Sequence, residues 1–356
     1  MTAGGPTNKP RWSATLDVGE PVAISVASPG MVVVAGTRAA IAHDTRGVQQ
    51  WRLGGCFVAA QALPDGRTVL RGTSDVRVVD MVGETLTRWS STGYWAPAPL
   101  DRERFIDLDN RGGLMCTAAS GEVSWRVDLE CWSLFRPAVA RTEIVVSDAD
   151  GLRTFDDRGQ PQFRVGLGAA RSGSSGLAAA EGPIFAFDGG YLAYVRKATA
   201  GSSWYFWRPV HGEIAPFAAG AAAWGPACVA VGGGNELFVA VGVDTSETNK
   251  QIVRAFAPSG EVVWKLETLR VVNAIGGLAD GQVALVCAPT INRWEKYRTF
   301  VRVEDECRLL IVDRDGKVRR NVALESPPAA AAAHAEGRVY VLRQDQLLVW
   351  DVDRPS

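Results

Sequence analysis

The residues that could carry out catalysis are few in this chain of 356 residues. It contains three histidines, and we expect two of them, His43 and His211, to be solvent-exposed residues of turns. Neither these nor His334 stand at a spacing that indicates a Ser-His-Asp triad, and no HExxH zinc motif is present. The sequence therefore contains no recognisable catalytic constellation, and it leaves open whether the protein is an enzyme.

Metal and cofactor sites have little support either. The acidic segments 107–110, 147–151 and 313–316 carry too few oxygen ligands for a calcium loop, so we expect ordinary turns. The glycine-rich segment 166–173 lacks the GxGxxG spacing of a nucleotide site, and we expect no metal and no cofactor. No two cysteines form a CxxC metal motif, and we expect buried free thiols, which are typical of a reducing compartment. The cysteines are Cys56, Cys116, Cys131, Cys228, Cys287 and Cys307.

One segment has the composition of a protein-binding surface. Residues 288–306 are rich in tryptophan, tyrosine and arginine, the residue types that dominate the binding energy of protein interfaces. We expect a protein partner to bind here. The alternative is a hairpin extension whose aromatic side chains pack back onto their own sheet. The residues expected to bind the partner are Arg293, Trp294, Lys296, Tyr297, Arg298 and Arg302.

A second set of aromatic and basic residues has the composition of a small-molecule pocket. Aromatic walls with a few convergent polar groups are typical of pockets for small ligands. The alternative is that these side chains only fill space inside the fold. The residues of this set are Tyr94, Trp95, Trp132, Arg136, Arg171 and Trp224.

The elements that must position these residues repeat along the chain. A tryptophan, or a phenylalanine in its place, follows a tight turn about every 38 residues in the first half of the chain. Each turn contains a glycine, because a short hairpin needs a residue with positive φ. A fixed period with strand signals indicates a repeat architecture, and we expect the aromatic residues to be structural anchors. The anchors are Trp12, Trp51, Trp89, Trp125, Phe163 and Trp264, and the glycines are Gly47, Gly83, Gly121, Gly159, Gly212, Gly260 and Gly316.

Each repeat has the turn pattern of a four-stranded unit, whose strands we call A to D. Period-2 apolar alternation between turns indicates strands, and no helical period is present, so the fold class is all-β. Four-stranded units of about 40–50 residues are typical of β-propeller blades. In the fifth repeat, both 180–182 and 188–190 could hold the A–B turn.

The ends of the chain complete the count of repeats. Eight D strands can be identified, at Trp12, Trp51, Trp89, Trp125, Phe163, Ile214, Trp264 and Arg319. Residues 337–352 supply strands without a D strand, whereas residues 10–18 supply a D strand alone. We therefore predict an eight-bladed β-propeller of four-stranded blades in which the N-terminal strand closes the last blade.

The repeat resembles that of a known family. The sequence GTRAAIAHDTRGVQQW (36–51) follows the pattern G-x-x-x-A-hydrophobic-Asp-x-x-Gly-x-x-x-W of the quinoprotein-like propellers, whose unit is the pyrroloquinoline quinone repeat. The resemblance covers almost the whole chain, and it implies an eight-bladed propeller whose tryptophans dock between neighbouring blades. The quinone-binding dehydrogenases of this family use two adjacent cysteines and a calcium ion. This chain has no adjacent cysteines, so it is similar to the non-quinone-binding members, which serve as scaffolds.

A propeller would place the long loops on one face and the second set of candidate residues at the central channel. The B–C turns and the D–A connections share a face, and three consecutive B–C turns are long: 196–203, 243–250 and 288–306. Such insertions often mark a binding face, and neutral expansion is the alternative. The second set lies at the start of A strands, which line the central channel. Asp107 and Asp109 interrupt an apolar strand and could face this channel.

We therefore predict an interaction scaffold that binds a protein partner through the face carrying the long loops. The alternative is an enzyme or a small-molecule-binding protein that uses the mouth of the channel. With 38 basic and 39 acidic residues, the net charge is −1 and gives no attraction to nucleic acid. No apolar run indicates a membrane span or a signal peptide. We expect a flexible tail over 1–9, one propeller domain over 10–356, and a cytoplasmic location if the chain is full length.

Overall fold

The computed structural model divides by its internal contacts into two compact units. The terminal unit consists of Met1–Gln49 and Pro226–Ser356, and the middle unit of Gln50–Gly225. The described residues are 9–27, 30–129, 136–140, 142–148, 151–166, 184–187, 190–197, 201–208, 213–217, 228–232, 237–242, 251–257, 259, 261–268, 271–288, 291–292, 301–302, 307–325, 328, 330–334 and 336–352.

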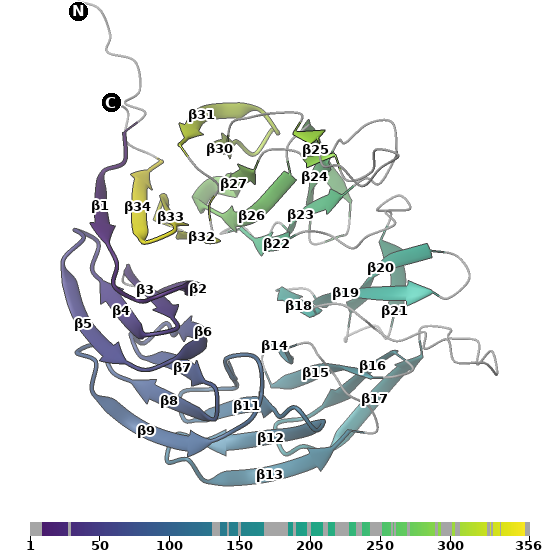
Figure 1. Ribbon diagram of the computed structural model, residues 1–356. Helices are drawn as coiled ribbons and strands as arrows, with labels where there is room; N and C mark the ends of the chain where they lie inside the picture. Colours follow the sequence, from purple (N-terminus) through teal and green to yellow (C-terminus); the bar gives the residue numbers. More distant parts are fainter. Residues whose placement is uncertain are drawn as a thin grey trace, which may run out of the picture. The chain divides into compact units, whose positions relative to one another are not determined.

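The middle unit contains four-stranded antiparallel sheets, each made of strands that follow one another along the chain (Figure 1). The first has β6 (Phe57–Ala62), β7 (Thr68–Gly72), β8 (Asp75–Val79) and β9 (Thr85–Ser90). The second has β10 (Ala98–Pro99), β11 (Arg104–Leu108), β12 (Gly113–Ala118) and β13 (Val123–Asp128). The third has β14 (Ala138–Ala140), β15 (Glu143–Asp148), β16 (Gly151–Phe155) and β17 (Pro161–Gly166). The fourth has β18 (Ile184–Phe187), β19 (Gly190–Lys197), β20 (Gly201–Arg208) and β21 (Glu213–Phe217).

The terminal unit has sheets of the same kind. One has β2 (Pro21–Ala27), β3 (Met31–Gly36) and β4 (Ala39–His43), followed by β5 (Gln49–Gly54), which begins at the unit boundary. Another has β22 (Cys228–Val231), β23 (Leu237–Gly242), β24 (Gln251–Phe256) and β25 (Val262–Thr268). A third has β26 (Val271–Gly277), β27 (Val283–Ala288), β30 (Cys307–Val312) and β31 (Val318–Leu324). The short strands β28 (Ile291–Asn292) and β29 (Val301–Arg302) pair with each other.

The first strand of the chain completes the last sheet of the terminal unit. This sheet has the order β1 (Trp12–Thr15), β34 (Gln346–Asp351), β33 (Arg338–Arg343) and β32 (Ala330–His334). Trp12 pairs with Val349 and Thr15 with Gln346 in antiparallel register. The predicted pairing of the N-terminal D strand with the C-terminal strands is therefore confirmed.

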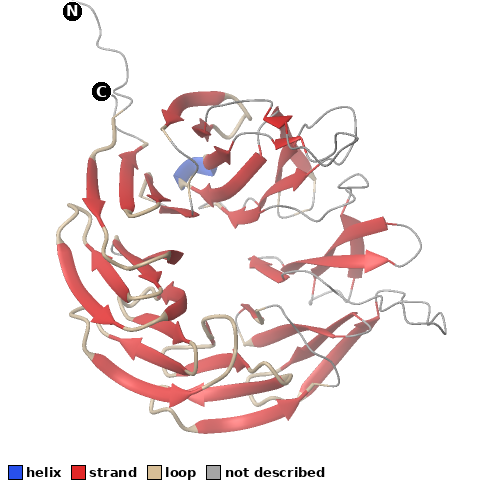
Figure 2. Cartoon of the chain, viewed as in Figure 1, coloured by secondary structure: helices blue, strands red, loops and turns tan. Residues whose placement is uncertain are grey.

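Strands dominate the described structure, as the prediction of an all-β fold requires (Figure 2). The helix found among the described residues is a 3-10 turn, η1 (Ala279–Gly281). None of the described segments forms a helix with the length and apolar character needed to cross a bilayer.

The core consists of consecutive sheets packed face to face within each unit. All residues of β3 and β7 are buried, because inner strands are covered on both faces. In the middle unit, one apolar cluster joins Ile106 and Cys116 of the second sheet to Ile144 and Phe155 of the third. In the terminal unit, another joins Ile41 of β4 to Tyr340 and other residues of β33 and β34. This stacking explains why the inner strands read as continuous apolar runs.

The tryptophan anchors dock against the glycine turn of the following repeat. A Cβ added to Gly83 would lie 2.5 Å from the Cβ of Trp51, and one added to Gly47 would lie 2.8 Å from the Trp12 ring. Both glycines also have positive φ. Glycine is therefore favoured at these positions both by the backbone conformation and by the close approach of the tryptophan. The Trp12 indole also donates a hydrogen bond of 3.1 Å to the Thr45 carbonyl in that turn. The predicted anchoring role of these tryptophans is confirmed.

One predicted anchor is wrong. Phe163 occupies the repeat position of the tryptophans, but its side chain is 60% exposed. Trp51, in contrast, is only 5% exposed.

The cysteines agree with the sequence-based expectation of buried thiols except at one position. Cys56 is exposed, whereas Cys116, Cys287 and Cys307 are buried as predicted.

An aspartate of the repeat closes the turn that precedes the D strands β5, β9, β17 and β31. Asp44 Oδ1 accepts hydrogen bonds from the backbone N–H of Arg46 at 2.8 Å and of Val48 at 2.9 Å. Asp80, Asp156 and Asp313 make the same pair of bonds in their own turns. Aspartate suits this position because its short side chain reaches the backbone two and four residues on. The acidic turn at 313–316 is therefore an ordinary turn, as predicted.

The fifth repeat differs from the sequence-based reading. Phe187 pairs with Gly190, so the A–B turn lies at 188–190, the second of the two alternatives. The segment 196–203, predicted as a long loop, is largely strand, because Arg196 pairs with Ser202 and Lys197 with Gly201. In the terminal unit, the pairing of β28 with β29 makes the ends of the 288–306 loop a hairpin extension.

His43 is buried, which corrects the prediction of an exposed turn residue. Its side chain lies at the end of β4, with its ring centroid 6.2 Å from that of Trp12. Its Nδ1 atom has no hydrogen-bond partner among the described residues. Burial lowers the pKa of His43 below its ordinary value of 6.5, and the nearby Asp44 carboxylate opposes this only in part.

This burial predicts a loss of stability on mild acidification. The unfolded chain binds a proton at His43 near pH 6.5, whereas the folded chain binds it only at lower pH, so the free energy of unfolding falls as the pH drops through 6.5. Urea unfolding on both sides of pH 6.5 measures this loss, and His43→Leu should reduce it. Asp44, Asp65 and Asp101 cannot cause it, because their lowered pKa values lie below 3.8. If the free energy of unfolding of His43→Leu depended on pH as steeply as that of the natural chain, His43 would not be the cause of the loss.

Candidate functional site

The connection between β9 and β10 presents two aromatic side chains to solvent. We call residues 91–97 the aromatic loop. Tyr94 is 58% exposed and Trp95 is 46% exposed, whereas Ser91, Ala96 and Pro97 are buried. Both aromatic residues belong to the second predicted set, and the structure places them in the connection before β10 instead of at the start of the strand. The loop therefore combines exposed aromatic rings with a buried backbone.

A buried arginine holds this loop from below. Arg71, at the end of β7, is fully buried, and its Nε donates a hydrogen bond of 2.9 Å to the Trp95 carbonyl. Its Nη2 forms an ion pair with Asp107 of β11, which is 1% exposed. Burial lowers the pKa of Arg71, and the Asp107 carboxylate opposes this by stabilising the charged form. The ion pair thus favours the charged form of the Arg71 guanidinium, which bonds to the backbone of the aromatic loop.

The same aspartate also binds the start of the loop. The Ser91 hydroxyl donates to Asp107 Oδ2 at 2.6 Å, and the Leu108 backbone N–H donates to Oδ1 at 2.9 Å. Gly93 lies so close to Arg71 and the Leu108 carbonyl that a Cβ there would collide with both. These contacts leave the aromatic loop little freedom to move.

Two further contacts join the aromatic loop to its surroundings. The Thr92 hydroxyl donates a hydrogen bond of 2.9 Å to the side-chain oxygen of Asn110, in the turn between β11 and β12. Arg136, just before β14, donates from Nη2 to the Pro97 carbonyl at 3.3 Å. Burial lowers the pKa of Arg136 to about 10. The structure therefore brings together three members of the second predicted set: Tyr94, Trp95 and Arg136.

The described groups of this arrangement include aromatic rings suited to recognition. Ser91 has no histidine beside it in the described network, and its acceptor Asp107 is already neutralised by Arg71. Within the described residues, no group of three His, Cys, Asp or Glu side chains is placed to hold a metal ion. Exposed tyrosine and tryptophan on a rigid backbone are, in contrast, the typical anchors of protein interfaces.

Asp107 and Asp109, which the sequence analysis suggested could face a channel, both have hydrogen-bond partners within the sheets and turns. Asp107 is buried in the network just described, and Asp109 closes the turn after β11 by accepting from the N–H groups of Arg111 and Gly113. Asp109 also pairs with Arg126 at 3.0 Å. Sequence reasoning missed Arg71, although a charged residue inside the apolar run TVLRG was a signal that a buried partner must exist.

The other predicted site residues lie outside the described residues. These are Trp132, Arg171 and Trp224 of the second set, and Arg293, Trp294, Lys296, Tyr297 and Arg298 of the 288–306 loop. The backbone of Arg302 is described as part of β29. Their roles stay predictions.

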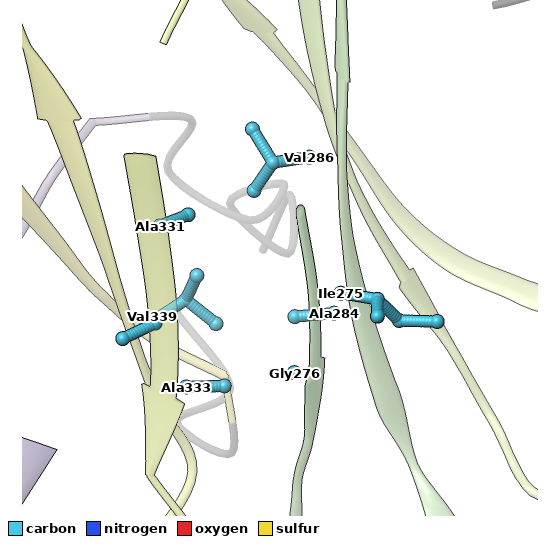
Figure 3. Close-up of a pocket in the computed structure, with 8 residues that line it drawn as sticks. Ile275, Gly276, Ala284, Val286, Ala331, Ala333 and Val339 are labelled. Carbon is cyan, nitrogen blue, oxygen red and sulfur yellow. The ribbon is translucent and has the colours of Figure 1, made fainter. Parts of the chain in front are cut away.

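A gap between two sheets of the terminal unit is a packing seam and not a ligand site. It has no room for a water molecule, and it lies between the strands β26 and β27 on one side and the strands β32 and β33 on the other (Figure 3). Its lining is apolar throughout, including Gly276, Ala331 and Ala333. A Cβ on Gly276 would collide with the Ala333 side chain, so small residues here let the sheets approach closely.

Comparisons with known proteins identify the fold. No family model matches the sequence, and no curated protein matches it. The structure is similar to Sqt1 of Saccharomyces cerevisiae (TM-score 0.65, 11% identity, 98% of this chain and 100% of that one). It is also similar to BamB from Moraxella catarrhalis, with a TM-score of 0.63 and 13% identity over 96% of this chain and 99% of that one. A third similar structure is the WD40 domain of SCAP from fission yeast, with a TM-score of 0.60 and 10% identity over 97% of this chain and 98% of that one. Because WD40 domains are propellers of four-stranded blades, these likenesses and the observed sheets show that the chain has the β-propeller fold.

Proposed function

We propose that this β-propeller is an interaction scaffold that binds a protein partner. One observation carries the proposal: Tyr94 and Trp95 are exposed, while Arg71 and Arg136 hold the backbone beside them. Large aromatic side chains that are exposed on a fixed backbone bury much area on binding and lose little conformational entropy. Solvent exposure of such rings is costly without a partner to cover them.

The proposal takes the chain as a single domain over residues 10–356, with eight blades. The face of the propeller that carries the long loops, including 288–306, stays the proposed binding face for the partner. The alternative, an enzyme or small-molecule protein using an aromatic pocket, stays a prediction on Trp132, Arg171 and Trp224.

The proposal predicts that partner binding depends on Trp95. Trp95→Ala should weaken binding about 30-fold or more, the effect of removing a hot-spot side chain. Phe163→Ala, which removes another exposed aromatic ring, serves as the control and should leave binding unchanged. The measurement is native mass spectrometry of protein purified from its source organism, followed by titration of the identified partner into each variant.

Two outcomes would overturn the scaffold proposal: a bare monomer in every preparation, or a bound species of a few hundred daltons in place of a polypeptide. Shortening residues 290–304 to a tight turn tests the 288–306 loop separately. If that change leaves binding intact while Trp95→Ala abolishes it, the aromatic loop is the binding site and the long loop is not.

A further inference from the structure

The carboxylates that support the aromatic loop and the turns beside it are each paired with arginine. A carboxylate held in this way adds little negative charge to the surface, because its partner cancels the field at short range. The pairs are Asp107–Arg71, Asp75–Arg77 at 2.8 Å, Asp75–Arg88 at 2.7 Å and Asp109–Arg126 at 3.0 Å.

Two other arginines at this surface have no acidic partner among the described residues. Arg111 is exposed, and it follows Asn110, whose side chain is bonded to Thr92 of the aromatic loop. Arg136 makes one hydrogen bond, to the Pro97 carbonyl, and its Nε is buried without a partner among the described residues. The cost of burying this cation would be offset by an anion from outside the chain.

Aromatic rings and arginines without an acidic partner among the described residues therefore occur together around one loop. Tyr94 and Trp95 offer apolar area, and Arg111 and Arg136 offer guanidinium groups, which bind carboxylates with well-defined geometry. From this juxtaposition we infer that the aromatic loop, with Arg111 and Arg136, binds an acidic peptide segment that carries an apolar side chain next to aspartate or glutamate. The inference rests on the proposed scaffold function and names the chemistry of its partner.

A single-stranded RNA would use the same groups, with bases stacked on the aromatic rings and phosphates on the arginines. The charge of the whole chain favours the peptide. Its net charge is −1, so no wider positive field supports the arginines in attracting a polyanion. A short acidic peptide needs only the local cations.

The test is selection of random peptides displayed on phage against the purified full chain. Selected peptides should be enriched in aspartate and glutamate beside leucine or an aromatic residue. A fluorescein-labelled selected peptide should then bind about tenfold or more weakly to Arg136→Gln, the loss of a hydrogen bond to a charged group. Because Arg111 makes no side-chain ion pair among the described residues, Arg111→Gln should leave folding intact and weaken binding a few-fold, and added salt should weaken it as well. Arg314→Gln, at an exposed turn arginine of the terminal unit, is the matched control and should have no effect.

Selected peptides without acidic enrichment, or acidic peptides that bind Arg111→Gln and Arg136→Gln as tightly as the natural chain, would overturn the inference. If the natural partner still requires Trp95 in that case, the scaffold function stands and only its acidic chemistry is wrong. Tight binding of a labelled oligouridylate that is lost in Trp95→Ala would overturn the inference in favour of nucleic acid. Absence of both a peptide and a natural partner would remove the proposed function as well.

Discussion

Replacing Asp107 by alanine is expected to lower the free energy of unfolding by about 3–5 kcal/mol. The reason is that Arg71 is fully buried and would lose its carboxylate partner. Removing one member of a buried ion pair leaves a charge without compensation, which costs far more than the pair itself contributes. The Ser91 hydroxyl and the Leu108 N–H would lose their acceptor at the same time.

Urea unfolding of the full chain measures this effect. Asp128→Ala is the control, because Asp128 also pairs with an arginine, at 3.0 Å, but is 79% exposed, so the expected loss is below about 1 kcal/mol. The double variant Arg71→Met with Asp107→Leu should recover much of the stability, since it removes both charges together. If Asp107→Ala and Asp128→Ala lowered the free energy of unfolding equally, the buried ion pair would not be what stabilises the aromatic loop.

Replacing Trp51 by alanine is expected to cost about 3–5 kcal/mol, the usual range for deleting a large buried aromatic side chain. Trp51 is buried against the turn that contains Gly83, in the next repeat of the middle unit. Its loss would open a cavity between two stacked sheets, and such a cavity costs stability because the surrounding structure relaxes only in part.

Phe163→Ala provides the matched comparison, because Phe163 stands at the same repeat position but is exposed. It should change the free energy of unfolding by no more than about 0.5 kcal/mol, as is usual for surface substitutions. Thermal or urea unfolding of both variants gives the two numbers. A large loss for Phe163→Ala would mean that this side chain is an anchor after all, and a small loss for Trp51→Ala would remove the anchoring role from the repeat.

Some features of this fold follow from neighbours in the sequence alone. The glycines at Gly47 and Gly83 adopt positive φ, and Asp44 and Asp80 bond to backbone groups two and four residues further on. Such contacts involve only a few consecutive residues, so their pattern repeats in the sequence and is readable there. The strand pairing of the N-terminal segment followed from the same repeat, since an incomplete unit at each end implied one complete sheet.

Other features depend on residues that are distant in the sequence. His43 reads as a turn residue, but Trp12 from the first strand covers it. Phe163 matches the repeat and yet is exposed, because burial depends on the surface that meets the side chain and not on its place in the motif. Tyr94, Trp95 and Arg136 were identified by composition, but the support that fixes them was not. Arg71 and Asp107 are 36 residues apart, and their charges meet only when consecutive sheets stack.

The sequence by itself therefore determined the repeating strands and their turns, because these rest on local backbone geometry and periodic burial. Tertiary structure alone decided which side chains are covered, which charges are paired, and which aromatic residues are left facing solvent on a fixed backbone. Those outcomes arise from contacts between separate sheets, whose partners no local pattern specifies.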